Sequence, residues 1–210
     1  MTEDKLTNLT QYEIFYTIAY HHFLEAKKLQ DKRMKCIEGL GNRDPNSDEL
    51  HVLSETGWQL SHHAVTAVIF SAISLEAYIN DYGIRRFSKS FFKEHLDKLK
   101  IVSKWVVIPR MTVGKTLDTS ARPFQRLKVL FSLRDKIVHF KSRQIGSDSL
   151  KEDDFVVFPA AENAIETVRT VIQALGQIDP MSNASWVQFT ENMGGMPAAV
   201  AIPKEGRNTT

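Results

Sequence analysis

Two side chains in the second half of the chain could act together on a phosphodiester. Arg134 offers a guanidinium, whose paired N–H donors fit two oxygens of a phosphate group. His139 offers an imidazole, which titrates near neutral pH and can transfer a proton. Asp135 lies four residues before His139, so that on a helix it would share the face of the imidazole and orient it. This spacing indicates a small site for phosphate binding and acid-base chemistry.

The spacing alone does not bring the guanidinium and the imidazole together. Arg134 and His139 are five residues apart, which separates them by about 140° around an ideal helix. We expect either a second copy of the chain or a helix that ends near His139 to bring them into one cleft. The sequence therefore predicts a site that one subunit leaves incomplete.

Two charged residues fall on the apolar faces of predicted helices. Arg134 lies within one apolar arc, and Glu76 lies within another, with Asn80 one turn further along. The residues of the two arcs are Leu127, Leu130, Phe131, Ile137 and Val138, and Trp58, Val65, Val68, Ile69, Ala72 and Ile79. Because a buried charge is costly without a partner, we predict that Glu76 approaches Arg134. The pair would either belong to the site or only fix the register of two helices.

The elements that must position these residues are helices. Apolar residues at helical spacing and capping residues predict helices over 11–38, 47–86, 88–100, 124–141 and 163–178. We expect Gly57 to interrupt the second of these helices. Because the sequence lacks a regular alternation of strands and helices, it predicts an all-α bundle of four to five helices.

Two segments between the helices are expected to be less regular. Residues 101–121 are interpreted as an ordered connector, because Pro109 and Gly114 break any long helix. Residues 155–159 are apolar and β-branched, and they predict one short strand or extended edge segment.

The chain is expected to form one domain with a short appendage. Residues 1–180 make the helical domain, and residues 181–210 make a C-terminal extension that is partly flexible and loosely held. Trp186 and Phe189 are the residues of this extension that could dock back onto the domain. We expect Trp58, Trp105 and Trp186 to be core anchors.

The composition excludes several classes of protein. A formal charge of +2 is too small for a protein that coats nucleic acid, so any phosphate contact must be local. The single cysteine, Cys36, excludes an intramolecular disulfide and a multi-cysteine metal centre. The sequence has no apolar stretch of signal-peptide length at its start and no uninterrupted membrane span, which predicts a soluble cytoplasmic protein without a membrane partner.

Four of the histidines stand as adjacent pairs on two predicted helices. The pairs are His21-His22 and His62-His63. Neighbours on a helix diverge by about 100°, so a metal would need ligands from both helices. Imidazoles at the surface or at the core edge are the simpler interpretation, and we expect no metal and no cofactor.

Two segments together resemble the HEPN superfamily, the helical domains named for higher eukaryotes and prokaryotes nucleotide-binding. The segment Arg134-Asp135-Lys136-Ile137-Val138-His139 fits the superfamily signature, which is Arg, then Asn, Asp or His, three further residues and His. The segment Ser74-Leu75-Glu76-Ala77-Tyr78-Ile79-Asn80 on an earlier helix adds to the resemblance. The resemblance covers residues 12 to 178 and implies a bundle of HEPN type.

The resemblance also implies an activity. Many HEPN proteins are metal-independent ribonucleases, often toxins or defence effectors, that dimerise so that two copies of the motif meet in one cleft. By this resemblance Arg134 would hold the scissile phosphate, and His139 would transfer protons while the ribose 2′-hydroxyl attacks. Asp135, Glu76 and Asn80 would support the site. RNA, a second copy of the chain, and an antitoxin or regulator are the partners implied.

Two basic residues follow the motif, and one position departs from a branch of the superfamily. In toxins paired with a nucleotidyltransferase antitoxin, a Tyr commonly stands two residues after the motif His, whereas this chain has Lys141. Adenylylation at that position is therefore not supported. Lys141 and Arg143 would either bind substrate phosphate or complement the negative end of the helix dipole.

Two other interpretations remain open at this point. One is a non-catalytic HEPN-like module that binds RNA, a nucleotide or a protein, in which Arg134 and Glu76 are structural. The other is a helical scaffold in which the motif is a coincidence.

Overall fold

The computed structural model describes residues 10–139 and 158–195, and these residues are helical wherever they form a regular element. The elements in chain order are α1 (Gln11–Leu40), α2 (Ser47–Arg86), α3 (Lys89–Phe91), the π-helical turn η1 (Phe92–Leu96), α4 (Ile101–Val113), α5 (Arg122–Val138), α6 (Phe158–Ile178), the 3-10 turn η4 (Pro180–Ser182) and α7 (Trp186–Asn192). The prediction of an all-α protein is confirmed.

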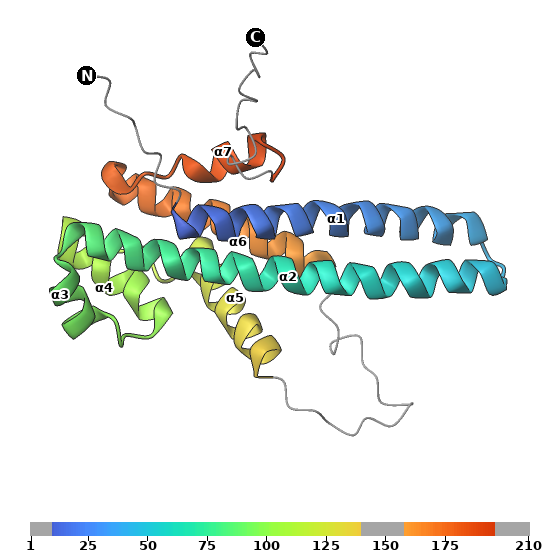
Figure 1. The fold of residues 1–210 in the computed structure, drawn as a ribbon, viewed down its shortest axis with the longest axis horizontal. Coiled ribbons are helices and arrows are strands. Elements are labelled where there is room, and N and C mark those ends of the chain that lie inside the picture. The colour runs from blue at the N-terminus through green and yellow to red at the C-terminus, as the bar shows by residue number, and fades with distance from the viewer. Residues whose placement is uncertain (1–9, 140–157, 196–210) are drawn as a thin grey trace, which may run out of the picture.

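The two longest helices form the axis of the molecule. α1 and α2 run antiparallel and pack along most of their length, and α6 packs against both of them (Figure 1). α5 contacts α2 and α6, while α4 packs on α2 near the end of that helix. α7 lies against α1, on the side of the axis away from α5 (Figure 1). α5, which carries the motif, is therefore held between α2 and α6.

α2 begins at a capping box and continues without a break. The Asn46 side chain accepts a hydrogen bond from the Glu49 N–H at 3.0 Å, and the Glu49 carboxylate accepts from the Asn46 N–H at 2.9 Å. The predicted interruption at Gly57 is wrong. Arg33 of α1 lies over Gly57 and donates to the carbonyl of Leu53, and a Cβ on Gly57 would lie only 2.7 Å from Arg33 Nη1. Gly57 leaves room for Arg33 and does not end the helix.

The connector predicted over 101–121 is wrong for its first part, which forms α4. Pro109 lies inside this helix, where it removes one backbone N–H donor. The helix survives because Pro109, Trp105 and Ile108 are buried, so that packing offsets the missing bond. α4 ends at Gly114, whose φ of 71° is in the left-handed region, and its N–H bonds to the Arg110 carbonyl.

The segment predicted as a strand and the helix predicted over 88–100 also differ from expectation. α6 already begins at Phe158, so Phe158 and Pro159 are helical and not extended, and residues 155–157 lie outside the described residues. The helix predicted over 88–100 is shorter, and consists of α3 and η1 with Ser88 as the cap of α3, as expected.

The chain after residue 180 is held against the domain as far as it is described. Trp186 is buried among the rings of Tyr12, Tyr16 and Tyr78, as a core anchor should be. Trp186 therefore docks back onto the domain, as the sequence analysis allowed. Phe189, the other candidate for docking, is 57% exposed.

Of the three tryptophans, one does not anchor the core. Trp105 is fully buried, whereas Trp58 is 77% exposed. Trp58 lies in the first third of α2, and the helical spacing that placed it in an apolar arc does not tell which part of so long a helix other elements cover.

α2 is also long and apolar enough to cross a membrane, judged by length and composition alone. Half of its most apolar window is buried inside the bundle. This is weak evidence for a membrane span, because the core helix of a helical bundle passes the same test.

Candidate functional site

Arg134 and Glu76 meet between α5 and α2, as the two apolar arcs predicted. Nη2 of Arg134 lies 3.4 Å from Oε2 of Glu76. The Arg134 guanidinium also lies over the Phe131 ring, at 5.4 Å from its centroid. Neither charge is fully buried, since the Arg134 side chain is 24% exposed and the Glu76 side chain 35%. The contact is long for a hydrogen bond and partly open to solvent, so its own contribution to stability is small.

Asp135 turns toward Arg134 rather than toward His139. Its Oδ1 lies 3.2 Å from Nε of Arg134, although the angle at the buried Nε does not meet hydrogen-bond geometry. In the described part of the chain, the Asp135 carboxylate makes no ion pair with the His139 imidazole. The expectation that Asp135 orients His139 is therefore not met in one copy of the chain. Asp135 instead adds a second carboxylate beside the guanidinium.

Asn80 accepts a hydrogen bond from a buried lysine that the sequence analysis did not identify. Lys104 of α4 is 2% exposed, and its Nζ donates to Oδ1 of Asn80 at 2.9 Å. Asp97 Oδ1 lies 3.8 Å from the same ammonium, and the Phe92 ring lies beneath it. Burial lowers the pKa of Lys104, while the charges of Asp97 and Glu76 oppose this shift.

Lys104 could have been found by the reasoning that found Arg134. It shares a helix face with Ile108, four residues later, within the apolar run that was interpreted as a connector. Once that run is read as a helix, Lys104 is a third charge on an apolar face. On the adjoining face of α2, Asn80 accepts the hydrogen bond of Lys104, and the partly exposed Glu76 acts on the same ammonium through its charge.

His139 lies at the end of α5 and faces solvent. The helix was predicted to reach Lys141 but ends at Val138, and His139 is its C-cap residue, with its N–H bonded to the Asp135 carbonyl at 2.9 Å. The His139 side chain is exposed. Arg134 points toward α2, so one copy of the chain does not bring the two motif groups together. Lys141 and Arg143 lie outside the described residues.

α5 concentrates positive charge although the whole chain is nearly neutral. It contains five basic residues and one acidic residue, a net charge of +4, whereas the chain as a whole carries +2. The basic residues are Arg122, Arg126, Lys128, Arg134 and Lys136. Such a local excess is what a helix needs to attract a polyanion.

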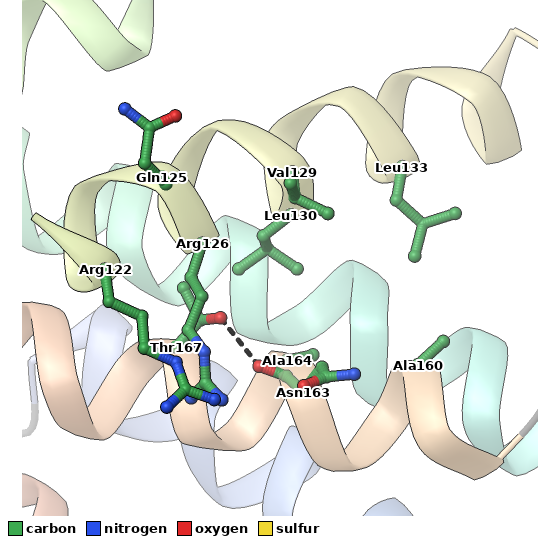
Figure 2. Close-up of a pocket in the computed structure, with 10 residues that line it drawn as sticks. All are labelled: Arg122, Gln125, Arg126, Val129, Leu130, Leu133, Ala160, Asn163, Ala164 and Thr167. Atoms are coloured by element: carbon green, nitrogen blue, oxygen red, sulfur yellow. Dashed lines mark hydrogen bonds between the residues drawn. The ribbon is translucent and has the colours of Figure 1, made fainter. Parts of the chain in front are cut away.

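Two hollows adjoin α5 on its outer side. A groove of about 440 Å³ lies between α5 and α6, with Arg122 and Arg126 at one end and an apolar wall beyond them (Figure 2). A second hollow, of about 460 Å³, is lined by Lys128, Val129, Ser132, Leu133 and Lys136. Val129 and Leu133 line both hollows, which therefore lie next to each other along α5.

The histidine pairs meet across α1 and α2. Nδ1 of His22 lies 2.8 Å from Nδ1 of His63, so one imidazole donates a hydrogen bond to the other. Burial is the main cause that lowers the pKa of both groups, and the neighbouring imidazoles add to it. Across residues 10–139 and 158–195, no group of three or more His, Cys, Asp or Glu side chains could hold a metal ion.

Comparison with known proteins adds no relative to this description. No model of a protein family, no curated protein and no solved structure matches the chain. The resemblance to HEPN domains therefore rests on the two sequence segments 74–80 and 134–139 alone.

Proposed function

We propose that this chain is a metal-independent endoribonuclease of HEPN type, which acts as a toxin or defence effector in the cytoplasm. The observation that supports this proposal best is the environment of Arg134. Its guanidinium is positioned by Glu76, Asp135 and Phe131, on the same basic helix that presents His139 to solvent. An arginine oriented in this way is suited to a phosphate oxygen.

The chemistry needs two roles, and the motif offers one residue for each. Nη1 of Arg134 makes no hydrogen bond within the described residues, so it would donate to the scissile phosphate and to the charge that develops on it. The His139 imidazole would take the proton of the ribose 2′-hydroxyl or give one to the leaving 5′-oxygen. Attack by the 2′-oxygen on phosphorus then leaves a 2′,3′-cyclic phosphate and a 5′-hydroxyl.

The proposed enzyme is a homodimer. In one copy of the chain, Arg134 contacts Glu76 of α2 while His139 caps the exposed end of α5. A second copy would bring the two groups into one cleft. Val129 and Val138 of α5 are 67% and 54% exposed, and they offer apolar surface for that contact. Lys141 and Arg143 stand two and four residues after His139 and would add positive charge to the shared cleft.

A second candidate is a non-catalytic module that binds RNA, a nucleotide or a protein. The paired contacts of Arg134 with Glu76 and Asp135 favour it, because an arginine that only links two helices would have the same partners. This candidate predicts that Arg134→Ala lowers the melting temperature, and that His139→Ala changes neither stability nor any cleavage.

The test is cleavage of an end-labelled RNA by purified full-length protein in EDTA, followed by identification of the new ends. We expect cyclic phosphate ends from the wild type, and a rate at least about 100-fold lower for Arg134→Ala and for His139→Ala. His51→Ala is the matched control, because His51 is exposed on α2 far from the motif. Undiminished cleavage by both motif variants, or intact RNA with the wild-type dimer, would contradict the proposal.

A further inference from the structure

We propose that the groove between α5 and α6 holds one unpaired nucleotide of a single-stranded RNA, with Arg122 on its phosphate. This inference rests on the proposed function and goes beyond it, because it assigns a substrate subsite away from the motif. The residues that line the groove belong to α5 and α6 and are labelled in Figure 2.

The two ends of the groove differ in chemistry. Arg122 and Arg126 lie together at the end near Thr167, whereas Leu133 and Ala160 lie at the opposite end (Figure 2). Leu130 and other apolar side chains form the wall between these ends. A ligand that fits must have an anionic group and a body with an apolar face, joined over a short distance. A nucleotide has both, as a phosphate and a base.

Arg122 is the arginine that is available for the phosphate. Nη1 of Arg126 lies 3.4 Å from the carboxylate of Glu166 on α6, so part of its charge is already compensated. Arg122 is exposed, and it has no ion pair among residues 10–139 and 158–195. A guanidinium without a protein carboxylate can offer two parallel N–H donors to one phosphate.

The other groups of the groove suit a nucleobase. The wall is aliphatic and can cover one face of a base by burying apolar surface, which selects no particular base type. The Asn163 side chain is exposed, and its amide can both donate to and accept from a base edge. The Thr167 hydroxyl donates to the backbone carbonyl of Asn163 at 2.6 Å and not to its side-chain amide (Figure 2). A base that inserts here cannot be paired at the same time, so the ligand is single-stranded.

The groove leads toward the motif. Leu133, at its far end, directly precedes Arg134, and the adjoining hollow adds Lys128 and Lys136. Arg122 and Arg134 are twelve residues apart on α5, or about 18 Å along the helix axis. An RNA strand in the groove would therefore continue over basic residues to the proposed cleavage site.

The experiment measures RNA binding separately from cleavage. A fluorescently labelled single-stranded RNA is titrated with full-length His139→Ala protein, alone and with either Arg122→Ala or Ala160→Leu added. Arg110→Ala is the matched control, because Arg110 is an exposed arginine on α4. Ala160 is half-buried at the apolar end, so that leucine fills the groove without replacing a core side chain. Circular dichroism and the melting temperature confirm that each variant is folded.

We expect Arg122→Ala and Ala160→Leu each to weaken binding by about five- to tenfold, and Arg110→Ala to leave it unchanged. Arg122→Ala should also reduce the slope of log binding constant against log salt concentration by about the amount of one phosphate contact. Ala160→Leu should leave that slope unchanged. Duplex RNA should bind more weakly than the single strand and should not respond to Ala160→Leu.

Three results would overturn the inference in distinguishable ways. If the wild type cleaves RNA but neither groove variant changes binding, the groove is not the subsite while the proposed function stands. If Ala160→Leu instead changes the oligomeric state in light scattering, the groove is a protein interface. If the wild type leaves RNA intact and His139→Ala does not bind it, the proposed function and the subsite both fail.

Discussion

The Lys104 ammonium donates to the Asn80 side-chain oxygen at 2.9 Å, in a position where Lys104 is 2% exposed. The nearest carboxylate, that of Asp97, is 3.8 Å away. The amide oxygen of Asn80 is therefore the closest acceptor for a charge that has little access to water. This contact joins α4 to α2 beside the residue that holds Arg134, since Glu76 lies one turn before Asn80.

Removal of the Asn80 acceptor should destabilise the fold. Asn80→Ala leaves the Lys104 ammonium short of a partner, which should cost about 1–3 kcal/mol of unfolding free energy and lower the melting temperature by about 2–4 °C per kcal/mol. Asn80→Asp should keep or raise the melting temperature, because a carboxylate beside the ammonium compensates its charge. Thermal unfolding of both variants checks this, and equal melting of Asn80→Ala and wild type would contradict it.

The Glu76→Ala variant tests whether Glu76 positions the Arg134 guanidinium for phosphate or only links α2 to α5. The Arg134–Glu76 contact is long and partly exposed, so its loss should lower stability by no more than about 1 kcal/mol. If Glu76 positions the guanidinium for phosphate, cleavage should fall by about tenfold or more through kcat. Glu76→Gln, which can still accept a hydrogen bond from Arg134, should recover part of that loss.

For each Glu76 variant, kcat and KM are measured together with the melting temperature. A large drop in melting temperature with unchanged kcat would show that the contact is only structural. Arg126→Ala, which removes a similar ion pair to α6, is unsuitable as a control because it lies in the groove. Arg85→Ala is the suitable control, because it breaks an exposed ion pair with Asp81 within α2.

The described part of the C-terminal extension should stabilise the fold mainly through the ring of Trp186. Trp186→Ala removes a buried indole that packs against Tyr12, Tyr16 and Tyr78, and should cost about 3–5 kcal/mol. Phe189→Ala, three residues later, should change the melting temperature little, because that ring is 57% exposed. Equal effects of the two variants in thermal unfolding would contradict the observed docking of α7.

The sequence predicted most helices because their apolar periodicity is strong, and it placed Glu76 beside Arg134 because two charges lay on apolar faces. It failed at Gly57 and Pro109, where residues that often end a helix are accommodated by neighbours. The Arg33 side chain lies over Gly57, and burial of Pro109 offsets its missing N–H. Such contacts are between helices, so spacing within one helix does not reveal them.

The candidate site was only partly predictable for a related reason. Wheel positions gave the face of Arg134 but not the rotamer of Asp135, which turned to Arg134 instead of His139. Lys104 was missed because its segment was not interpreted as a helix. The groove between α5 and α6 depends on how two helices diverge, which no local pattern encodes.

Acidic pH should weaken the α1–α2 pairing at His22 and His63. Both groups have a folded-state pKa below the ordinary value of 6.5. The unfolded chain therefore takes up protons first as the pH falls below about 6.5, and stability declines from there down through the lowered folded pKa values. Glu25 opposes this effect, while His21 and His62 add to it.

The measurement is the melting temperature between pH 7.5 and 5. His22→Gln/His63→Gln should show a smaller decline than the wild type, because the shared imidazole pair is gone. His51→Gln, which alters an exposed histidine on the same helix as His63, should follow the wild type. If the double variant declines as steeply as the wild type, the pair does not govern this part of the pH dependence.

A mixture of two inactive variants can show whether the proposed site is shared between subunits. Suppose that Arg134 of one copy works with His139 of the other. A dimer of one Arg134→Ala chain and one His139→Ala chain then has one site that lacks both groups and one site that is intact. After subunit exchange, an equimolar mixture should regain about one quarter of the wild-type cleavage rate, since half of the dimers are mixed and each has one of two sites. If both groups come from the same chain, every site in the mixture lacks one of them, and the mixture should stay as inactive as either variant alone.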